Sequence, residues 1–168
     1  MGATIIRAPV RSRAHPGQQR PEGATAARCT LHWGRDNARR ISSVADLEGL
    51  LSFLTTVRGR EGAPHGVDLM PAGAAGGGLQ LGVGHPHRSF VVWLDADANH
   101  SIVPGHGGYG IDDDLDPWPE PIGFDCGADV IDFKPAWTRV SPRSAIQAAR
   151  EYVLTGAMPT CLRFDPNV

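Results

Sequence analysis

The sequence has few cysteines and no long apolar run. Cys29, Cys126 and Cys161 form no C-x-x-C pair, which argues against a zinc ribbon or a redox dithiol. No segment approaches the roughly 20 apolar residues that a membrane span requires. The arm formed by residues 1–26 lacks the continuous apolar core of a signal peptide. We therefore expect a cytoplasmic protein that does not enter a membrane.

The motifs of common enzyme classes are also missing. No G-x-S-x-G presents a serine nucleophile beside a base, and the glycines of residues 105–110 lack the lysine of a phosphate-binding loop. Asp95 and Asp97 fit the opening of a calcium loop, but His100 occupies the position that requires glycine. Cys126 has acidic neighbours, which disfavour a thiolate. We therefore predict that the chain is not an enzyme and holds no cofactor or metal.

Two other functions stay open as alternatives. A small metal-dependent hydrolase could use His85 and His87 with the Asp112–Asp114 cluster, because imidazoles and carboxylates suit several divalent ions. Metal bound to the purified protein would favour it. A nucleic-acid-binding module could use the arginine-rich arm at residues 1–26, and it would show steep salt dependence that disappears when the arm is deleted.

The charges are unevenly distributed along the chain. With 168 residues the chain is long enough for one domain with a real core, and its net charge of -2 leaves no general footprint for nucleic acid. Residues 1–40 contain eight arginines and two acids, whereas residues 95–132 contain ten acids and no lysine or arginine. We therefore divide the chain into a flexible basic arm, 1–26, and a single α+β domain, 27–168, with an acidic surface.

Two helices are predicted from their caps and apolar stripes. The first follows Ser42 or Ser43 and has one apolar face with Val44 and Leu47. The second begins at Ser141-Pro142 and ends at a glycine, and its apolar stripe comprises Ala145, Ile146, Ala149, Tyr152 and Val153.

The remaining apolar segments are short and read as strands. We expect them at residues 28–33, 66–70, 79–83, 90–94, 101–103, 122–125, 130–133 and 160–164, with loops at 34–40 and 104–121. The run at 90–94 is apolar at every position, which predicts a central strand covered on both faces. The fold is therefore α+β, an antiparallel sheet of about five to seven strands with two helices packed on it.

Three segments carry a family resemblance. EYVLTGAMPTCLRFD at 151–165, SFVVWLDADANHSIV at 89–103 and DVIDFKPAWTRVS at 129–141 resemble the first family of immunity proteins from bacterial polymorphic toxin systems. In that family a late helix ends in Thr-Gly or Ser-Gly, a proline follows, and a short strand closes the domain. That strand often holds a tryptophan where this chain has Phe164. The resemblance implies an immunity protein that acts by binding a cognate toxin, often one similar to nucleic-acid deaminases.

The segment GYGIDDDLDPWPEP at 108–121 is the best candidate for the binding surface. It combines acids with aromatic and aliphatic side chains, and three prolines stiffen it and lower the cost of ordering on binding. An acidic loop suits a toxin with a basic substrate cleft. We predict that this loop and the turn at 95–99 cover the toxin's active site, with the binding residues Asp95, Asp97, Tyr109, Asp112, Asp113, Asp114, Asp116, Trp118 and Glu120.

Overall fold

The structure is a computed structural model that describes residues 28–73, 77–96 and 107–168. These residues form two α-helices, two short 3-10 helices and nine strands in an α+β arrangement. In chain order the elements are β1 (Cys29–Trp33), β2 (Asn37–Ile41), α1 (Val44–Thr56), η1 (Arg60–Gly62), β3 (His65–Pro71), β4 (Gly78–Val83), β5 (Val91–Leu94), β6 (Tyr109–Ile111), β7 (Ile122–Asp125), β8 (Val130–Phe133), η2 (Pro135–Trp137), α2 (Pro142–Thr155) and β9 (Arg163–Asp165).

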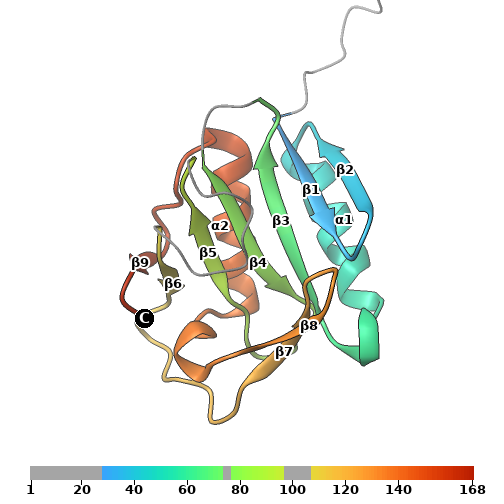
Figure 1. The fold of residues 1–168 in the computed structure, drawn as a ribbon. Coiled ribbons are helices and arrows are strands. Elements are labelled where there is room, and N and C mark those ends of the chain that lie inside the picture. The colour runs from blue at the N-terminus through green and yellow to red at the C-terminus, as the bar shows by residue number, and fades with distance from the viewer. Residues whose placement is uncertain (1–27, 74–76, 97–106) are drawn as a thin grey trace, which may run out of the picture.

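Seven of the strands follow one another across the sheet in the order β2-β1-β3-β4-β5-β6-β9, and each neighbouring pair is antiparallel. The hairpin β7–β8 joins the sheet at the start of β3 through one parallel pairing, His65 with Asp125. Figure 1 shows both helices behind the sheet and the hairpin across its lower end. The α+β prediction is confirmed, with nine strands among the described residues in place of five to seven.

Both helices begin at the predicted serine caps, and α2 also ends at the predicted glycine. Ser43 caps α1 by accepting a hydrogen bond from the Asp46 amide at 3.1 Å. Ser141 caps α2 in the same way, accepting from the Ser144 amide at 3.0 Å, with Pro142 at the first helical position. Gly156 ends α2 at φ 68°, where its amide donates to the Tyr152 carbonyl at 2.7 Å.

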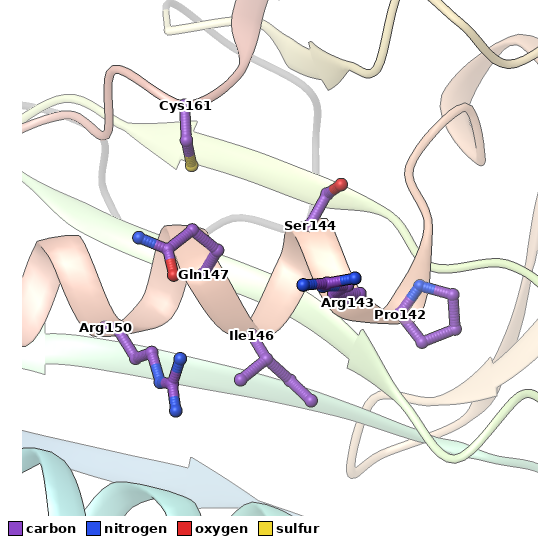
Figure 2. Close-up of a pocket in the computed structure, with 7 residues that line it drawn as sticks. All are labelled: Pro142, Arg143, Ser144, Ile146, Gln147, Arg150 and Cys161. Carbon is purple, nitrogen blue, oxygen red and sulfur yellow. The ribbon is translucent and has the colours of Figure 1, made fainter.

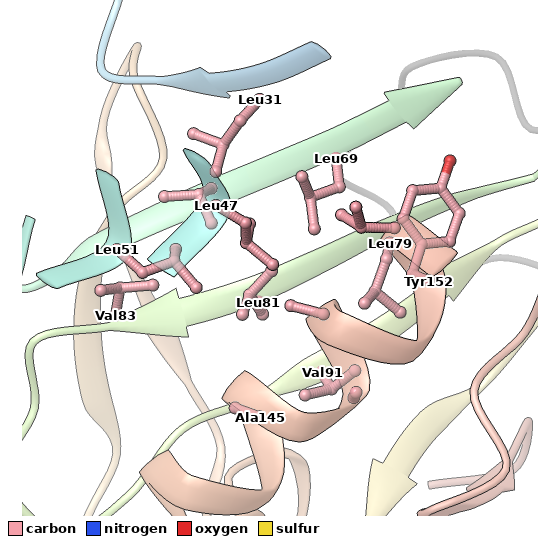
Figure 3. Packing of buried hydrophobic residues seen from close by; sticks show 14 of the residues in the cluster. Leu31, Leu47, Leu51, Leu69, Leu79, Leu81, Val83, Val91, Ala145 and Tyr152 are labelled. Carbon is pink, nitrogen blue, oxygen red and sulfur yellow. The ribbon is translucent and has the colours of Figure 1, made fainter. Parts of the chain in front are cut away.

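The main core lies between the helices and the sheet. Figure 3 shows leucines from α1, β1, β3 and β4 meeting the inner face of α2, where Ala145 and Tyr152 point toward the sheet. Leu31, Leu69 and Leu79 are completely buried. The Tyr152 hydroxyl is satisfied in this apolar setting because it donates to the Gly77 carbonyl at 2.9 Å.

A second, smaller core lies on the face of the sheet opposite the helices. Phe90 stacks on Phe133 of β8 with ring centroids 3.8 Å apart, and Phe124 of β7 meets Phe90 edge-on at 4.9 Å. Val92 joins this cluster, whereas Val91 faces the main core. The segment at residues 90–94 is therefore covered on both faces, as its continuous apolar run predicts, and its strand begins at Val91.

Several strand predictions need correction. Residues 34–40 are not all loop, because Gly34 at φ 56° turns the chain into β2, an edge strand with four exposed residues. The predicted loop 104–121 contains β6, whose three residues are buried. The last strand, β9, begins at Arg163, later than expected. The predicted strand at 101–103 lies outside the described residues.

Asp125 joins the hairpin β7–β8 to η1, the short 3-10 helix that follows α1. Its carboxylate is buried and accepts hydrogen bonds from the amides of Arg60 at 2.9 Å and Gly127 at 3.0 Å. A side chain at Gly59 would collide with this carboxylate, so the close approach requires glycine. His65, also buried, lies beside the same junction.

The same substitution should have opposite effects at a glycine of the second core and at an exposed glycine of α1. A Cβ on Gly82 would lie 2.5 Å from Phe124 and 3.0 Å from Phe90, whereas a Cβ on Gly49 in α1 meets nothing within 4 Å. We expect Gly82→Ala to lower the free energy of unfolding by about 1–3 kcal/mol through overpacking. Gly49→Ala should raise it by about 1 kcal/mol through helix propensity. Urea unfolding measures both, and equal shifts would contradict this packing of the second core.

His65 makes stability depend on pH. Burial lowers the pKa of His65 below its ordinary value of 6.5, and this effect prevails over the nearby Asp125 carboxylate. The unfolded chain therefore binds the proton more readily, so stability falls as pH drops below 6.5. The slope reaches at most about 1.4 kcal/mol per pH unit. His65→Gln should flatten this part of the profile in urea unfolding at pH 5 to 8 (about the range where histidine titrates).

The matched control is His32→Gln, which makes the same change at an exposed histidine of β1. A profile that is flattened by both variants, or by neither, would show that His65 is not the group responsible.

Candidate functional site

The acidic loop, defined here as residues 112–121, connects β6 to β7 and is tied to the start of α2. The Asp112 amide donates to the Arg139 carbonyl at 2.8 Å, and the Leu115 amide turns back to the Asp112 carbonyl at 3.0 Å. The Asp112 carboxylate accepts a hydrogen bond from the Ser144 hydroxyl at 2.8 Å. The carboxylate and the backbone of Asp112 therefore hold the loop against the start of α2.

Three arginines from separate parts of the chain contact this loop. Arg139, just before α2, donates from Nε to the Leu115 carbonyl at 2.9 Å. Arg88, in the β4–β5 turn, donates from Nη2 to the Asp116 carbonyl at 3.2 Å. Arg163 of β9 donates to the Asp113 carboxylate at 2.9 and 3.1 Å.

The contact between Arg163 and Asp113 also changes the pKa of the Asp113 carboxyl. The hydrogen bond from Arg163 holds the pKa of the Asp113 carboxyl below its ordinary value. Both side chains are at least half exposed, so the ion pair is open to water and screened by salt. Asp113 is thus a partly compensated charge at the edge of the loop.

Trp118 is held by the β4–β5 turn. Its ring stacks on His87 with centroids 5.8 Å apart and meets His85 edge-on at 5.9 Å. The Arg88 guanidinium lies over the same ring at 5.1 Å. The turn is itself ordered, because Nδ1 of His85 accepts the Arg88 amide at 3.0 Å. Trp118 remains half-buried and therefore presents part of its ring at the surface.

These contacts leave three carboxylates uncompensated. Asp114, Asp116 and Glu120 are exposed. Among the described residues, none of the three carboxylates forms a hydrogen bond or an ion pair. The acidic loop therefore carries three outward negative charges on a backbone that other residues hold.

The other predicted binding residues lie elsewhere. Tyr109 is buried in β6, where it stacks on Trp137 at 5.1 Å and burial raises its pKa to about 12. Its place among surface residues is therefore not supported by the structure. Asp95 follows β5 and accepts the indole N–H of Trp93 at 3.0 Å. Asp97 lies outside the described residues.

The residues that metal or thiol chemistry would need are histidines, aspartates and Cys126 in the part of the chain that the structure describes. No group of three or more His, Cys, Asp or Glu side chains there could hold a metal ion. His85 and His87 contact Trp118, while Asp112 and Asp113 bond to Ser144 and Arg163. The two histidines and two of the aspartates named for the hydrolase alternative therefore contact different partners. Burial, with smaller effects from two nearby aspartates, raises the pKa of Cys126 to about 12, which keeps it a thiol.

Of the hollows that the described residues form outside the acidic loop, two have a cysteine in their lining. One, of about 580 Å³, opens on the solvent side of α2, where Figure 2 shows two arginines and a cysteine around it. Its lining residues are Pro142, Arg143, Ser144, Ile146, Gln147, Arg150 and Cys161. The other, of about 360 Å³, is lined by His32, Gly34, Arg35, Asp68, Met70, Cys126, Gly127 and Ala128. Burial raises the pKa of the Cys161 thiol to about 11 and that of Cys126 to about 12, so neither hollow offers an activated thiolate.

The comparison with known families decides what kind of protein this is. The family model of immunity protein Imm1 matches residues 35–166, which include both helices, the acidic loop and β9. The chain belongs to the Imm1 family of immunity proteins. No curated protein matches the sequence. None of the described helices is long and apolar enough to cross a membrane.

Sequence reasoning located the acidic loop but missed the residues that hold it. Arg88, Arg139 and Arg163 are 28, 24 and 50 residues away from their loop partners, and no local pattern links such distant positions. The order of strands brings them together. The sequence offers one indirect signal. Arg88 and Arg139 are the nearest arginines before and after the acidic segment at residues 95–132.

Proposed function

We propose that this Imm1 family member binds a cognate protein toxin and neutralises it by placing the acidic loop over the toxin's active site. The observation that carries the proposal is the set of three exposed, uncompensated carboxylates, Asp114, Asp116 and Glu120, on a loop whose backbone is held by hydrogen bonds. Family membership supports the immunity function, and the loop supplies a means of binding.

Electrostatics favour a basic partner. Uncompensated charges on one surface attract an oppositely charged partner over a Debye length, about 10 Å at 0.1 M salt, and speed up the formation of the complex. The loop is held before binding, so little conformational entropy is lost on docking. The prolines at 117, 119 and 121 restrict it further.

Trp118 supplies an apolar centre for the same surface. Aromatic residues surrounded by polar groups are frequent hot spots of protein interfaces. Trp118 lies between Asp116 and Glu120 in the chain and rests on His87, so its exposed edge is held in a defined position. The proposed surface therefore combines one fixed aromatic ring with three negative charges.

A toxin that acts on nucleic acid is the partner class that fits this surface best. Enzymes that bind nucleic acid neutralise phosphates with lysine and arginine, so their substrate clefts are basic. An acidic loop can occupy such a cleft in place of the phosphates. Deaminases are included in this class, as the family resemblance implies. We place the encounter in the cytoplasm, and the immunity protein acts there by binding rather than by catalysis.

The charges can be tested by a matched pair of triple variants. The test variant is Asp114→Asn, Asp116→Asn, Glu120→Gln. The control variant is Asp36→Asn, Glu61→Gln, Asp129→Asn, which removes three exposed acids away from the loop. Both change the net charge from -2 to +1. With the toxin domain encoded beside this gene, we expect the test variant to associate about 10- to 100-fold more slowly at low salt and to protect co-expressing cells poorly.

The control should associate at close to the rate of the unmodified protein and should rescue growth. Equal loss in both variants would mean that net charge alone matters. An unaffected test variant would show that the acidic loop is not the toxin-binding surface.

A further inference from the structure

The acidic loop should not hold one conformation by itself. Residues 112–120 contain five carboxylates, and like charges this close repel one another. Three of the residues from 117 to 121 are prolines, which have no amide to donate. Groups outside the loop must therefore hold it, and they must do so without covering the carboxylates that would meet a partner.

Arg139 is placed to do this on one side. It contacts the loop twice, since its Nε donates to the Leu115 carbonyl and its own carbonyl accepts the Asp112 amide. The next residue, Val140, is completely buried and accepts the Ser89 amide at 2.8 Å. The packing of Val140 in the core thus fixes the backbone of Arg139. The Arg139 side chain in turn holds the loop through its hydrogen bond to Leu115.

Arg88 does the same on the other side. It precedes Ser89, whose hydroxyl is buried and donates to the Gly82 carbonyl at 2.7 Å. Ser89 and Val140 pair as an isolated bridge, so Arg88 and Arg139 extend from adjacent segments of one junction. The Arg88 guanidinium reaches both the Trp118 ring and the Asp116 carbonyl. Its Nε is buried and has no partner among the described residues, so these are the contacts that orient it.

Arg139 and Arg88 bond to main-chain carbonyls of the loop, so they leave its carboxylates unpaired. A guanidinium that bonds to a carbonyl oxygen holds the backbone and leaves the nearby carboxylates unpaired. Of the three arginines, Arg163 alone forms ion pairs among the described residues, with Asp113 at the edge of the loop and with Asp165 of its own strand. The three cations offset the repulsion within the loop while Asp114, Asp116 and Glu120 stay available.

We propose that Arg88, Arg139 and Arg163 are positioning residues that hold the acidic loop in its toxin-binding form before the toxin arrives. This inference rests on the proposed function, because the loop must be the binding surface for its order to matter. The largest contribution comes from Arg139, whose bond is partly buried, and the smallest from the exposed Arg163.

Charge and positioning make opposite predictions for these residues, which allows a sharp test. Replacing Arg88 or Arg139 by methionine changes the net charge from -2 to -3 and makes the surface more acidic. If the arginines mattered only through charge, a basic toxin would bind the variants faster and more tightly. If they position the loop, the complex dissociates faster because the loop is no longer held.

The experiment has two measurements on Arg88→Met, Arg139→Met and Arg139→Lys. Hydrogen exchange of the free protein follows the Asp112 and Leu115 amides, which are bonded in the ordered loop. Binding kinetics with the toxin domain encoded beside this gene give kon and koff. Arg139→Lys keeps the charge but loses the Nε–H that reaches Leu115. The control is Arg143→Met, which removes an exposed cation of α2 outside the loop (Figure 2).

For the Arg139 variants, both Met and Lys, we expect exchange at these two amides and koff to rise about tenfold, because a hydrogen bond to a charged group is lost. Arg88→Met should show a smaller rise in both. Arg143→Met should leave exchange unchanged, and any effect of its charge should be confined to kon.

Three outcomes separate this inference from the proposed function. Unchanged exchange in the Arg139 variants overturns the positioning role, whatever the toxin does. Faster exchange with unchanged koff overturns the link to binding if the Asp114, Asp116 and Glu120 triple variant still weakens the complex. If that triple variant is also without effect, the loop is not the binding surface and the proposed function fails with it. If Arg139→Met unfolds, the test of Arg139 rests on Arg139→Lys, which keeps the charge and most of the side chain.

Discussion

Apolar burial on both faces of β5 is the constraint on which the other features depend. Val91 faces the helices, while Phe90 and Val92 face the aromatic core beneath the β7–β8 hairpin. The hairpin must cross the sheet to cover Phe90, and the chain that leads to it from β6 is the acidic loop. The same requirement places Ser89 beside Val140, the junction from which two of the arginines reach the loop.

The site illustrates how a charged surface can be both ordered and available. Exposed ion pairs contribute little to stability, and pairing every acid would remove the field that attracts a partner. Here Arg88 and Arg139 bond to main-chain carbonyls. Among the described residues, only Asp112 and Asp113 of the acidic loop have partners for their carboxylates. The proposed binding role depends on such a surface more than on reactive groups, since affinity comes from preorganisation and complementarity.

Local patterns predicted the elements whose signals are local. Ser141, Pro142 and Gly156 placed α2 to within a residue, and the short apolar segment at 79–83 is β4 with one more residue at its start. The edge strand β2, with exposed and charged residues, and the three-residue β6 were missed because their formation depends on a neighbouring strand. Tyr109 was assigned to the surface for the same reason, since its burial comes from pairing with β5 and stacking on Trp137.

The sequence by itself determined that the chain is an α+β protein of the immunity type, with an acidic, proline-stiffened loop and no recognisable catalytic motif. The immunity type came from the resemblance of three segments to a known family. The other properties follow from composition, caps and periodicity, which act over a few residues. Only the tertiary structure decided which acids are free and which are held, because that depends on partners such as Arg139 and Ser144 that the sheet brings to the loop. Contacts across 24 to 50 residues are set by the packing of the two cores, and no local pattern encodes them.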